Sequence, residues 1–428
     1  MAIHSQLTPC GPAGRALALL ACLGLLSGQA PAAPEGSDPF FGDGGTSDFY
    51  RWVGPALTKP GVMLRQEPVG EGFYADHASL AQRILYSSTD GRFNRGVVEA
   101  SGLIYLPKGQ VPKGGWPLVV WGHGTLGIAD VCAPSWHKPN ERDGTFVDKW
   151  LQAGFAVVAP DYQGLGTPGV HPYLQRKPEG YSVLDAARAA IAAYPGKIAN
   201  RVILTGQSQG SGAVLNATSV AKTYAPDVRL MGTIATALLW RAADKAEPAR
   251  DVMVPDAARY AIMRLASGGY RPGSPPLDQV LSAKGKALAA AAAKGCSRDL
   301  VPVLAQEGID GPNAFTIPPA QVAAMFSSIA APRQNLGVPL LIATGKSDRT
   351  IDTRAQSAAV QAMCRYGNRI EWRTYAGIGH SATSHASLVD AIPFARALLA
   401  GRKTANDCGH IVPLGPPTKA DMSIPFND

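Results

Sequence analysis

Short apolar runs recur along the chain, and segments with the apolar spacing of a helix separate most of them. The apolar runs predict strands over 83–86, 102–107, 117–121, 155–161, 201–205, 230–237, 338–344 and 369–375. Helical spacing predicts helices over 145–154, 181–191 and 386–399. Strands that alternate with helices indicate a parallel sheet with helices on both faces. The first two runs have no helix between them, which predicts antiparallel strands at the start of a mixed, mostly parallel α/β sheet.

A long insertion interrupts this alternation. About 100 residues separate the sixth predicted strand, 230–237, from the next one at 338–344, which is too long for a simple connection. The stretch contains an alanine-rich helical segment at 284–294. We therefore expect a helical cap over residues 238–335, inserted after the sixth strand and covering the active site, between core segments 34–237 and 336–428.

The amino terminus has the pattern of an export signal. Arg15 precedes an apolar run at 16–26, and small residues follow as far as Ala33. The run is too short for a membrane span, which needs about 20 residues, so residues 1–33 are predicted to be a signal peptide. No later apolar run is long enough to span a bilayer, so we expect a secreted or periplasmic protein with a flexible arm at 34–48.

Composition narrows the classes of partner and cofactor. The 428 residues are 46% hydrophobic and carry a formal net charge of +8, and the Lys and Arg residues are scattered, which argues against nucleic-acid binding. Four cysteines follow the signal, Cys132, Cys296, Cys364 and Cys408. An oxidising compartment would pair them into two disulfides, and their spacing does not match a metal site. The G-x-G at 164–166 runs into prolines instead of opening a helix, so neither a dinucleotide nor any other cofactor is expected.

The candidate nucleophile is Ser208. It lies in Gly206-Gln207-Ser208-Gln209-Gly210, between the predicted strand 201–205 and a helix-compatible segment. This is the context of a nucleophile elbow, in which a strained turn exposes the serine and the glycines let strand and helix approach closely.

Two further residues complete a predicted triad. Asp348 and His380 each follow a predicted strand, in the chain order Ser, Asp, His. The serine hydroxyl needs an imidazole to take its proton, and the imidazole needs a carboxylate to orient it. His385 and His410 are less suitable bases, because one lies at the entrance of the final helix and the other in the tail. Asp352 is the rival acid, but its position favours a helix-capping role.

The predicted oxyanion hole uses two backbone N–H groups. The strand at 117–121 ends in Gly122-His123-Gly124-Thr125, a strand tip at which backbone donors could receive an oxyanion. We expect the N–H groups of Thr125 and Gln209 to form the pair, and His123 to orient its own loop.

Several segments together resemble the secretory lipase family of the α/β-hydrolase superfamily, over roughly residues 50–410. They are 121–125, 132–135, 161–169 with 171–174, 182–185, 206–210 and 224–226. The resemblance implies hydrolysis of carboxylic esters through an acyl-enzyme, with Ser208 as nucleophile, His380 as general acid and base, and Asp348 as its orienting acid. It also implies disulfides Cys132–Cys296 and Cys364–Cys408. Gln207 departs from the family, in which many members have His or Tyr at this position.

These observations predict an exported esterase or lipase. Small, apolar cap residues, notably 289–293, favour an ester with an apolar acyl group, whether a small molecule or a lipid. A serine peptidase or an acyltransferase would use the same triad, and a non-catalytic binding module on the same fold is the third alternative. An acidic cluster that could bind a peptide amine is missing near the predicted cap, which disfavours the peptidase.

Overall fold

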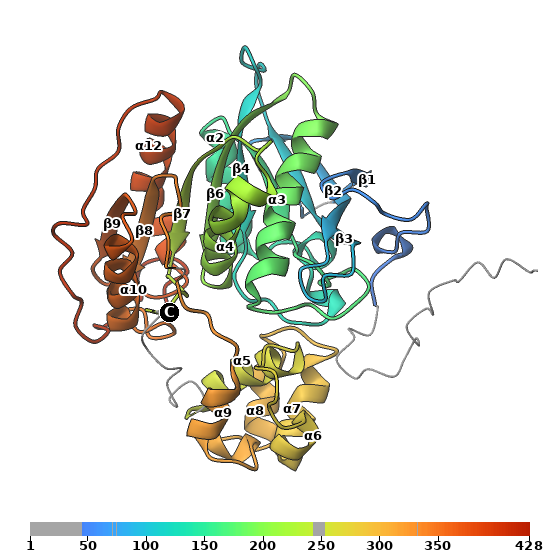
Figure 1. Cartoon of the computed structure of the whole chain (residues 1–428), viewed down its shortest axis with the longest axis vertical. Helices are drawn as coiled ribbons and strands as arrows, with labels where there is room; N and C mark the ends of the chain where they lie inside the picture. The colour runs from blue at the N-terminus through green and yellow to red at the C-terminus, as the bar shows by residue number, and fades with distance from the viewer. Residues whose placement is uncertain (1–44, 71, 74, 243–252, 332) are drawn as a thin grey trace, which may run out of the picture. The chain divides into compact units, whose positions relative to one another are not determined.

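The computed structural model describes residues 45–70, 72–73, 75–242, 253–331 and 333–428. The predicted signal peptide and most of the predicted arm lie outside these residues. Within them, one nine-stranded sheet has the order β1-β2-β3-β5-β4-β6-β7-β8-β9 (Figure 1). The strands are β1 (Met63–Pro68), β2 (Ala78–Thr89), β3 (Val97–Pro107), β4 (Trp116–Gly122), β5 (Ala156–Pro160), β6 (Ile198–Gln207), β7 (Leu230–Thr236), β8 (Leu340–Gly345) and β9 (Ile370–Tyr375).

The sheet is mixed and mostly parallel, as predicted. β1, β2, β3 and β5 pair in antiparallel fashion, whereas the pairs from β5 through β4 to β9 are parallel. β4 is buried on both faces: Leu118 and Val120 belong to one hydrophobic cluster, and Val119 and Trp121 belong to another. Because side chains alternate along a strand, an uninterrupted apolar run is what two buried faces require.

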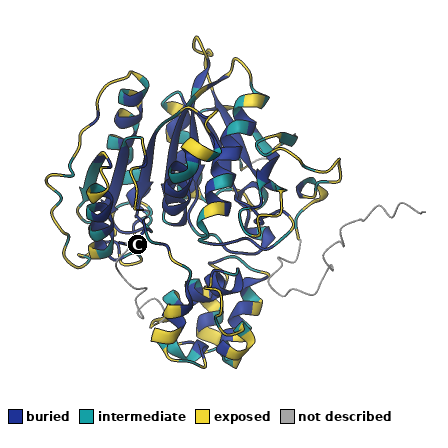
Figure 2. Cartoon of the chain, in the orientation of Figure 1, coloured by how far each residue is buried: buried dark blue, intermediate teal, exposed yellow. Residues whose placement is uncertain are grey.

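Helices cover both faces of the sheet. They are α2 (Glu141–Gln152), α3 (Arg176–Ala193), α4 (Gln209–Tyr224), α10 (Thr353–Arg365), α12 (Leu388–Leu399) and the short α1 (Pro134–His137) and α11 (Thr383–Ala386). Helices α3, α4 and α10 pack on one face, and α2 and α12 pack on the other. The central strands are almost wholly buried, the edge strands β1 and β9 are only partly buried, and the helices keep exposed outer positions (Figure 2).

Several elements differ from the predictions, among them β2 and β3, which both begin five residues before the predicted strands. The edge strand β1 was not predicted, because its sequence is half polar and only partly buried, and the long insertion consequently follows the seventh strand, β7. Helix α2 begins four residues early, at Glu141, because the Asn140 side chain caps it by accepting from Asp143 N. Helix α3 begins at Arg176, five residues before the predicted start. Pro178 is tolerated in the first turn, because the N–H that proline lacks would have no intrahelical partner there.

Between β7 and β8 the described residues form a helical insertion, residues 253–331. Its helices are α5 (Pro255–Ala266), α6 (Leu277–Val280), α7 (Ala283–Ala292), α8 (Leu300–Gln306) and α9 (Pro319–Met325). They share a hydrophobic cluster that includes Ile262, Leu288 and Val322. Ile128 and Tyr173, from loops next to the sheet, are buried in the same cluster, so the insertion packs against those loops.

The two disulfides implied by the family resemblance are both present. Cys132–Cys296 joins the 3-10 turn η2 (Asp130–Cys132) to the segment between α7 and α8. Cys364–Cys408 joins α10 to the tail. The first bond therefore ties the helical insertion to the loop that follows β4.

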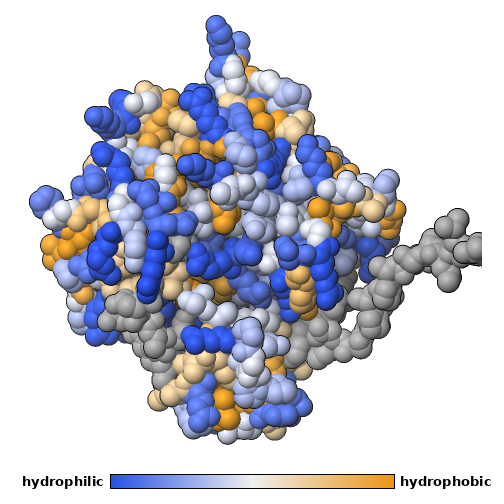
Figure 3. Space-filling view, viewed as in Figure 1, coloured by the Kyte–Doolittle hydropathy of each residue, from blue (hydrophilic) through white to orange (hydrophobic). Residues whose placement is uncertain are grey.

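Hydrophobic residues on the face shown in Figure 3 lie in small groups between hydrophilic ones. Large exposed apolar side chains, such as Val53, Val389 and Val412, come from separate parts of the chain. Within the described ranges, none of the helices has the length and apolar character needed to cross a membrane.

Replacing both cysteines of a pair by serine should lower the free energy of unfolding. On the chain-entropy model the Cys364–Cys408 bond, which closes a 44-residue separation, contributes up to about 4 kcal/mol. The Cys132–Cys296 bond, with a separation of 164, contributes up to about 5 kcal/mol. Urea unfolding of the two double variants measures both effects, and unchanged midpoints would contradict the expectation.

Candidate active site

Ser208 lies in a strained turn between β6 and α4. Its φ is 56° and its ψ is −118°, a conformation that residues with a side chain rarely adopt. The backbone around it is well anchored, since Ser208 N donates to Thr236 O at 3.0 Å and Ser211 N donates to Ser208 O at 2.9 Å. This is the elbow that the sequence predicts.

The flanking glycines are required by close backbone contacts. A Cβ added to Gly210 would lie 1.9 Å from the carbonyl oxygen of Gly122, and one added to Gly206 would lie 2.2 Å from that of Gly210. Backbone atoms cannot move aside as the end of a flexible side chain can. Helix α4 can therefore start this close to β4 only because both positions are glycine.

His380 and Asp348 form a buried pair. His380 Nδ1 lies 3.0 Å from Asp348 Oδ1 and 2.9 Å from Oδ2, so the ring donates its Nδ1 proton to the carboxylate. The carboxylate also accepts from the N–H groups of Thr350 and Ile351 at 3.0 and 2.8 Å, and from Gln356 Nε2 at 2.8 Å. Asp348 is thus held by five donor contacts in all, and its orientation fixes that of the imidazole.

Two opposing effects act on the pKa of His380. Burial lowers it, but the charge of Asp348 and the hydrogen bond to it raise it by more, so the pKa lies above the ordinary 6.5. An ordinary histidine would be mostly neutral near pH 7. His380 needs a somewhat higher pH to reach the neutral form that a general base requires.

The serine turn and the histidine loop are in contact through Gln207. Its Nε2 donates to the carbonyl oxygen of His380 at 3.3 Å. Ser208 Oγ and His380 Nε2 share no direct hydrogen bond among the described residues. The structure therefore brings the serine turn next to the His380–Asp348 pair, and the Ser208–His380 hydrogen bond of the predicted triad is not formed in the described part of the chain.

The rival candidates face elsewhere. His385 Nε2 donates to the carbonyl of Arg142 at 2.9 Å, and burial lowers the pKa of this histidine. Asp352 is the N-cap of α10, because its side chain accepts from Arg354 N at 2.8 Å. The capping role expected for Asp352 is confirmed.

The loop of the predicted oxyanion hole, residues 122–125, is fixed by side chains. His123 Nδ1 donates to Gly124 O at 2.7 Å, which is the orienting role expected for it. Tyr162 OH donates to His123 O at 3.0 Å, and Thr125 Oγ1 lies 2.7 Å from Tyr173 OH. In the described part of the chain, no protein acceptor receives the N–H of Thr125 or that of Gln209.

The sequence did not reveal the tail's contact with the histidine loop. Asn427 Oδ1 accepts from Gly379 N at 2.6 Å, and its Nδ2 donates to Gly377 O at 2.7 Å. Ser381 N donates to Asp428 Oδ1 at 2.8 Å. The tail sequence contains prolines and Cys408, but no local signal in it indicates that the chain returns to the loop carrying His380.

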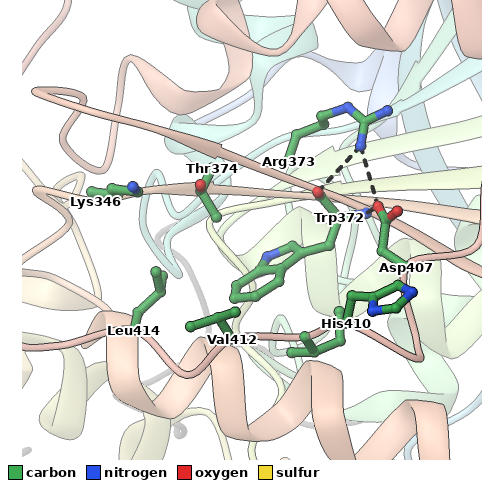
Figure 4. Close-up of a pocket in the computed structure, with 9 residues that line it drawn as sticks. Lys346, Trp372, Arg373, Thr374, Asp407, His410, Val412 and Leu414 are labelled. Carbon is green, nitrogen blue, oxygen red and sulfur yellow. Dashed lines mark hydrogen bonds and ion pairs between the residues drawn. The ribbon is translucent and has the colours of Figure 1, made fainter.

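A surface hollow of about 360 Å³ lies at the β9 edge of the sheet (Figure 4). Lys346, Trp372, Arg373, Thr374, Asp407, His410, Ile411, Val412 and Leu414 line it. Arg373 bonds to Asp407 and to the Trp372 carbonyl across its rim. The hollow includes none of the three predicted triad residues.

No group of three or more metal-ligating side chains occurs among the described residues.

Comparison with known proteins identifies similar chains. The family model for Secretory lipase matches residues 140–407. A secreted triacylglycerol lipase of Malassezia globosa is 25% identical over 293 residues, which cover 63% of this chain and 59% of that protein. The chain thus spans about six tenths of the length of this relative.

Two solved structures show the same fold at low identity. Candida antarctica lipase A in its closed state has a TM-score of 0.61 and 18% identity, and the match covers 91% of this chain and 92% of that one. The rice cell wall degrading esterase LipA from Xanthomonas oryzae has a TM-score of 0.59 and 17% identity, with 81% and 100% covered.

Gly210→Ala should abolish the close approach of α4 to β4. The added Cβ would overlap the Gly122 carbonyl, so the elbow must shift, and a shift of about 1 Å lowers turnover on the order of 10²-fold. Gly144→Ala, in helix α2, is the matched control, because a Cβ added to Gly144 would meet no neighbouring atom within 4 Å. It should raise stability by about 0.5–1 kcal/mol with unchanged turnover. Equal behaviour of the two variants in ester assays and thermal melts would refute the packing argument.

Substitutions at Asp348 and Asp352 should have different effects, one on turnover and the other on stability. Asp348→Asn should lower turnover by about 10⁴-fold, because the imidazole loses its orienting carboxylate. Asp352→Ala should keep turnover and lower the free energy of unfolding by about 1 kcal/mol through loss of the cap. For the parent, the acid limb of kcat/KM should lie above pH 6.5, since protonated His380 cannot act as a base. A larger loss of turnover for Asp352→Ala would reverse the assignment.

Proposed function

The chain belongs to the secretory lipase family, and on that premise we propose that it is an exported carboxylic ester hydrolase of the esterase or lipase type. The observation that carries the proposal is the strained Ser208 turn beside the buried His380–Asp348 pair. The α/β-hydrolase fold shared with solved lipase and esterase structures also supports it.

In the proposed reaction, Ser208 Oγ attacks the acyl carbon while His380 Nε2 takes the hydroxyl proton. Asp348 holds the Nδ1–H and stabilises the imidazolium. The tetrahedral intermediate collapses, its bond to the alcohol breaks, and His380 returns the proton to the leaving oxygen. Water then attacks the acyl-enzyme with His380 again as base, which releases the acid and restores the serine.

The N–H groups of Thr125 and Gln209 are the proposed oxyanion donors. They come from the two segments that meet at the elbow, and neither is used by a protein acceptor among the described residues. A donor placed at this point is worth about 2.7–4 kcal/mol of transition-state stabilisation. Both donors are backbone groups, so the direction of each N–H depends on the side chains that hold its segment in place.

Residues 238–335 are proposed to act as a cap that contributes walls to the acyl pocket. Ser297 N donates to Leu126 O at 2.6 Å, directly after the oxyanion loop, and Cys296 is bonded to Cys132. Tyr173, whose hydroxyl contacts Thr125, is buried in the cluster of the helical insertion. The disulfide pins one side of the cap, so its opening is limited, and the small residues at 289–293 favour an apolar acyl group.

Export is proposed from three observations. The amino-terminal pattern predicts a signal peptide, the family and the Malassezia globosa relative are described as secretory or secreted, and the two disulfides suit an oxidising compartment. The proposed location is therefore extracellular or periplasmic, where lipid or small-molecule esters are the substrates.

Ser208→Ala should lower ester hydrolysis by about 10⁴-fold or more without unfolding the protein. The assay is a panel of p-nitrophenyl esters of rising acyl length beside peptide anilides, with a phosphonate as a covalent probe of the serine. Ser219→Ala, in the same helix, is the control, since Ser219 Oγ donates to the carbonyl oxygen of Asn216, one turn earlier, at 2.7 Å. Turnover of peptides but not esters would indicate a peptidase, and activity of Ser208→Ala within tenfold of the parent would refute the nucleophile.

A further inference from the structure

The side chain of Gln209 is held by two buried groups from a distant part of the chain. Gln209 Nε2 lies 2.9 Å from Glu179 Oε1, on α3, and 3.1 Å from His171 Nε2, in the loop before α3. Glu179 Oε1 also accepts from Leu174 N at 2.9 Å. Glu179, His171 and Gln209 are all at most 1% exposed.

The hydrogen-bond pattern of this network has one consistent arrangement. His171 Nδ1 lies 3.0 Å from the carbonyl oxygen of Gln163, and a carbonyl can only accept, so Nδ1 carries the proton. His171 Nε2 is then an acceptor. The amide of Gln209 has two hydrogens, and it can donate one to His171 and the other to Glu179. Burial lowers the pKa of His171 to about 4, which agrees with a neutral ring near pH 7.

The network acts on the residue that follows the nucleophile. Gln209 is the first residue of α4, and its backbone N–H is one of the two proposed oxyanion donors. If its side chain rotated away, the Gln209 amide and His171 Nε2 would lose their partners, and Glu179 Oε1 would keep only the N–H of Leu174. Each buried polar group left unpaired would cost about 1–3 kcal/mol. The side-chain bonds thereby fix the first turn of α4.

We propose that Glu179 and His171 are positioning residues that act through Gln209, holding its backbone N–H towards the oxyanion formed on the substrate. This inference rests on the proposed esterase function. It assigns to α3 and the loop before it a role in the reaction, although neither contains a predicted triad residue.

Glu179 also gives the network a dependence on pH. Burial raises its pKa to about 8, although the bonds from Gln209 and Leu174 oppose the shift. The charge of Glu179 acts on Tyr162 and Tyr173, and Gln209 joins it to His171. Burial lowers the pKa of the histidine and raises the pKa of both tyrosines, so all three are neutral from pH 7 to 9. Two cations act on the same cluster, Arg92 on His171 and Arg264 on Tyr173, but among the described residues neither forms an ion pair with Glu179. Above pH 8 the Glu179 carboxylate therefore adds an unpaired negative charge behind the oxyanion donors, and this charge opposes formation of the oxyanion.

The test compares Glu179→Gln and Glu179→Leu with the parent, using p-nitrophenyl butyrate from pH 6 to 10. Glutamine keeps the acceptor for Gln209 but cannot ionise, so Glu179→Gln should hold kcat within about threefold at pH 7 and lose the fall in kcat above pH 8. Leucine removes the acceptor, so Glu179→Leu should lower kcat about 10- to 100-fold with KM within about threefold.

Asp185→Asn is the matched control for loss of a buried carboxylate on the same helix. Asp185 Oδ2 accepts from Tyr224 and Ser88 at 2.6 and 2.8 Å, and among the described residues it has no hydrogen bond with Gln209. This variant should lower the melting temperature and leave the pH dependence of kcat as in the parent.

The outcomes separate this inference from the proposed function. If Ser208→Ala is inactive while a folded Glu179→Leu keeps the parental kcat, the positioning role is overturned and the esterase function stands. The positioning role is also overturned if kcat of Glu179→Gln falls above pH 8 as it does in the parent. This second measurement decides the question if Glu179→Leu does not fold. Full activity of Ser208→Ala overturns both proposals.

Discussion

The close contact between Gly210 and the carbonyl of Gly122 is the constraint on which the site depends. It lets α4 begin directly over the end of β4, and a single added methyl group would lie 1.9 Å from that oxygen. The same turn places Ser208 at a φ of 56°, which costs on the order of 1–3 kcal/mol. Such a strained conformation persists only where many surrounding contacts hold it in place, so the packing around the turn must be rigid.

Rigidity comes from buried side chains that form hydrogen bonds with the backbone or side chains of neighbouring segments. Gln207 reaches the His380 carbonyl, Tyr162 reaches the His123 carbonyl, and Gln209 is held by Glu179 and His171. A buried polar group without a partner is costly, so each bond fixes one loop relative to another. The serine turn, the loop that carries His380 and the loop at 122–125 thus form one connected unit, although they lie far apart in sequence.

The disulfides and the tail extend this unit outward. Cys132–Cys296 ties the helical insertion to the loop after β4, and Cys364–Cys408 anchors the tail to α10. From there the chain returns to the histidine loop, where Asn427 bonds the backbone of Gly379 and Gly377. Such covalent ties persist in an oxidising compartment, which agrees with the proposed export.

The sequence by itself determined most of the sheet and the elbow, and it predicted that His380 and Asp348 would lie together, because these depend on local signals. The signals are an apolar run for a buried strand, glycines for a tight turn and a strand end for each polar residue. It missed β1, whose half-polar pattern is that of a partly exposed edge. Only the tertiary structure brought Glu179 and His171 together with Gln209. Their partner Gln209 lies 30 and 38 residues away, and a buried polar bond over that distance depends on how helices pack and leaves no periodic mark in the sequence.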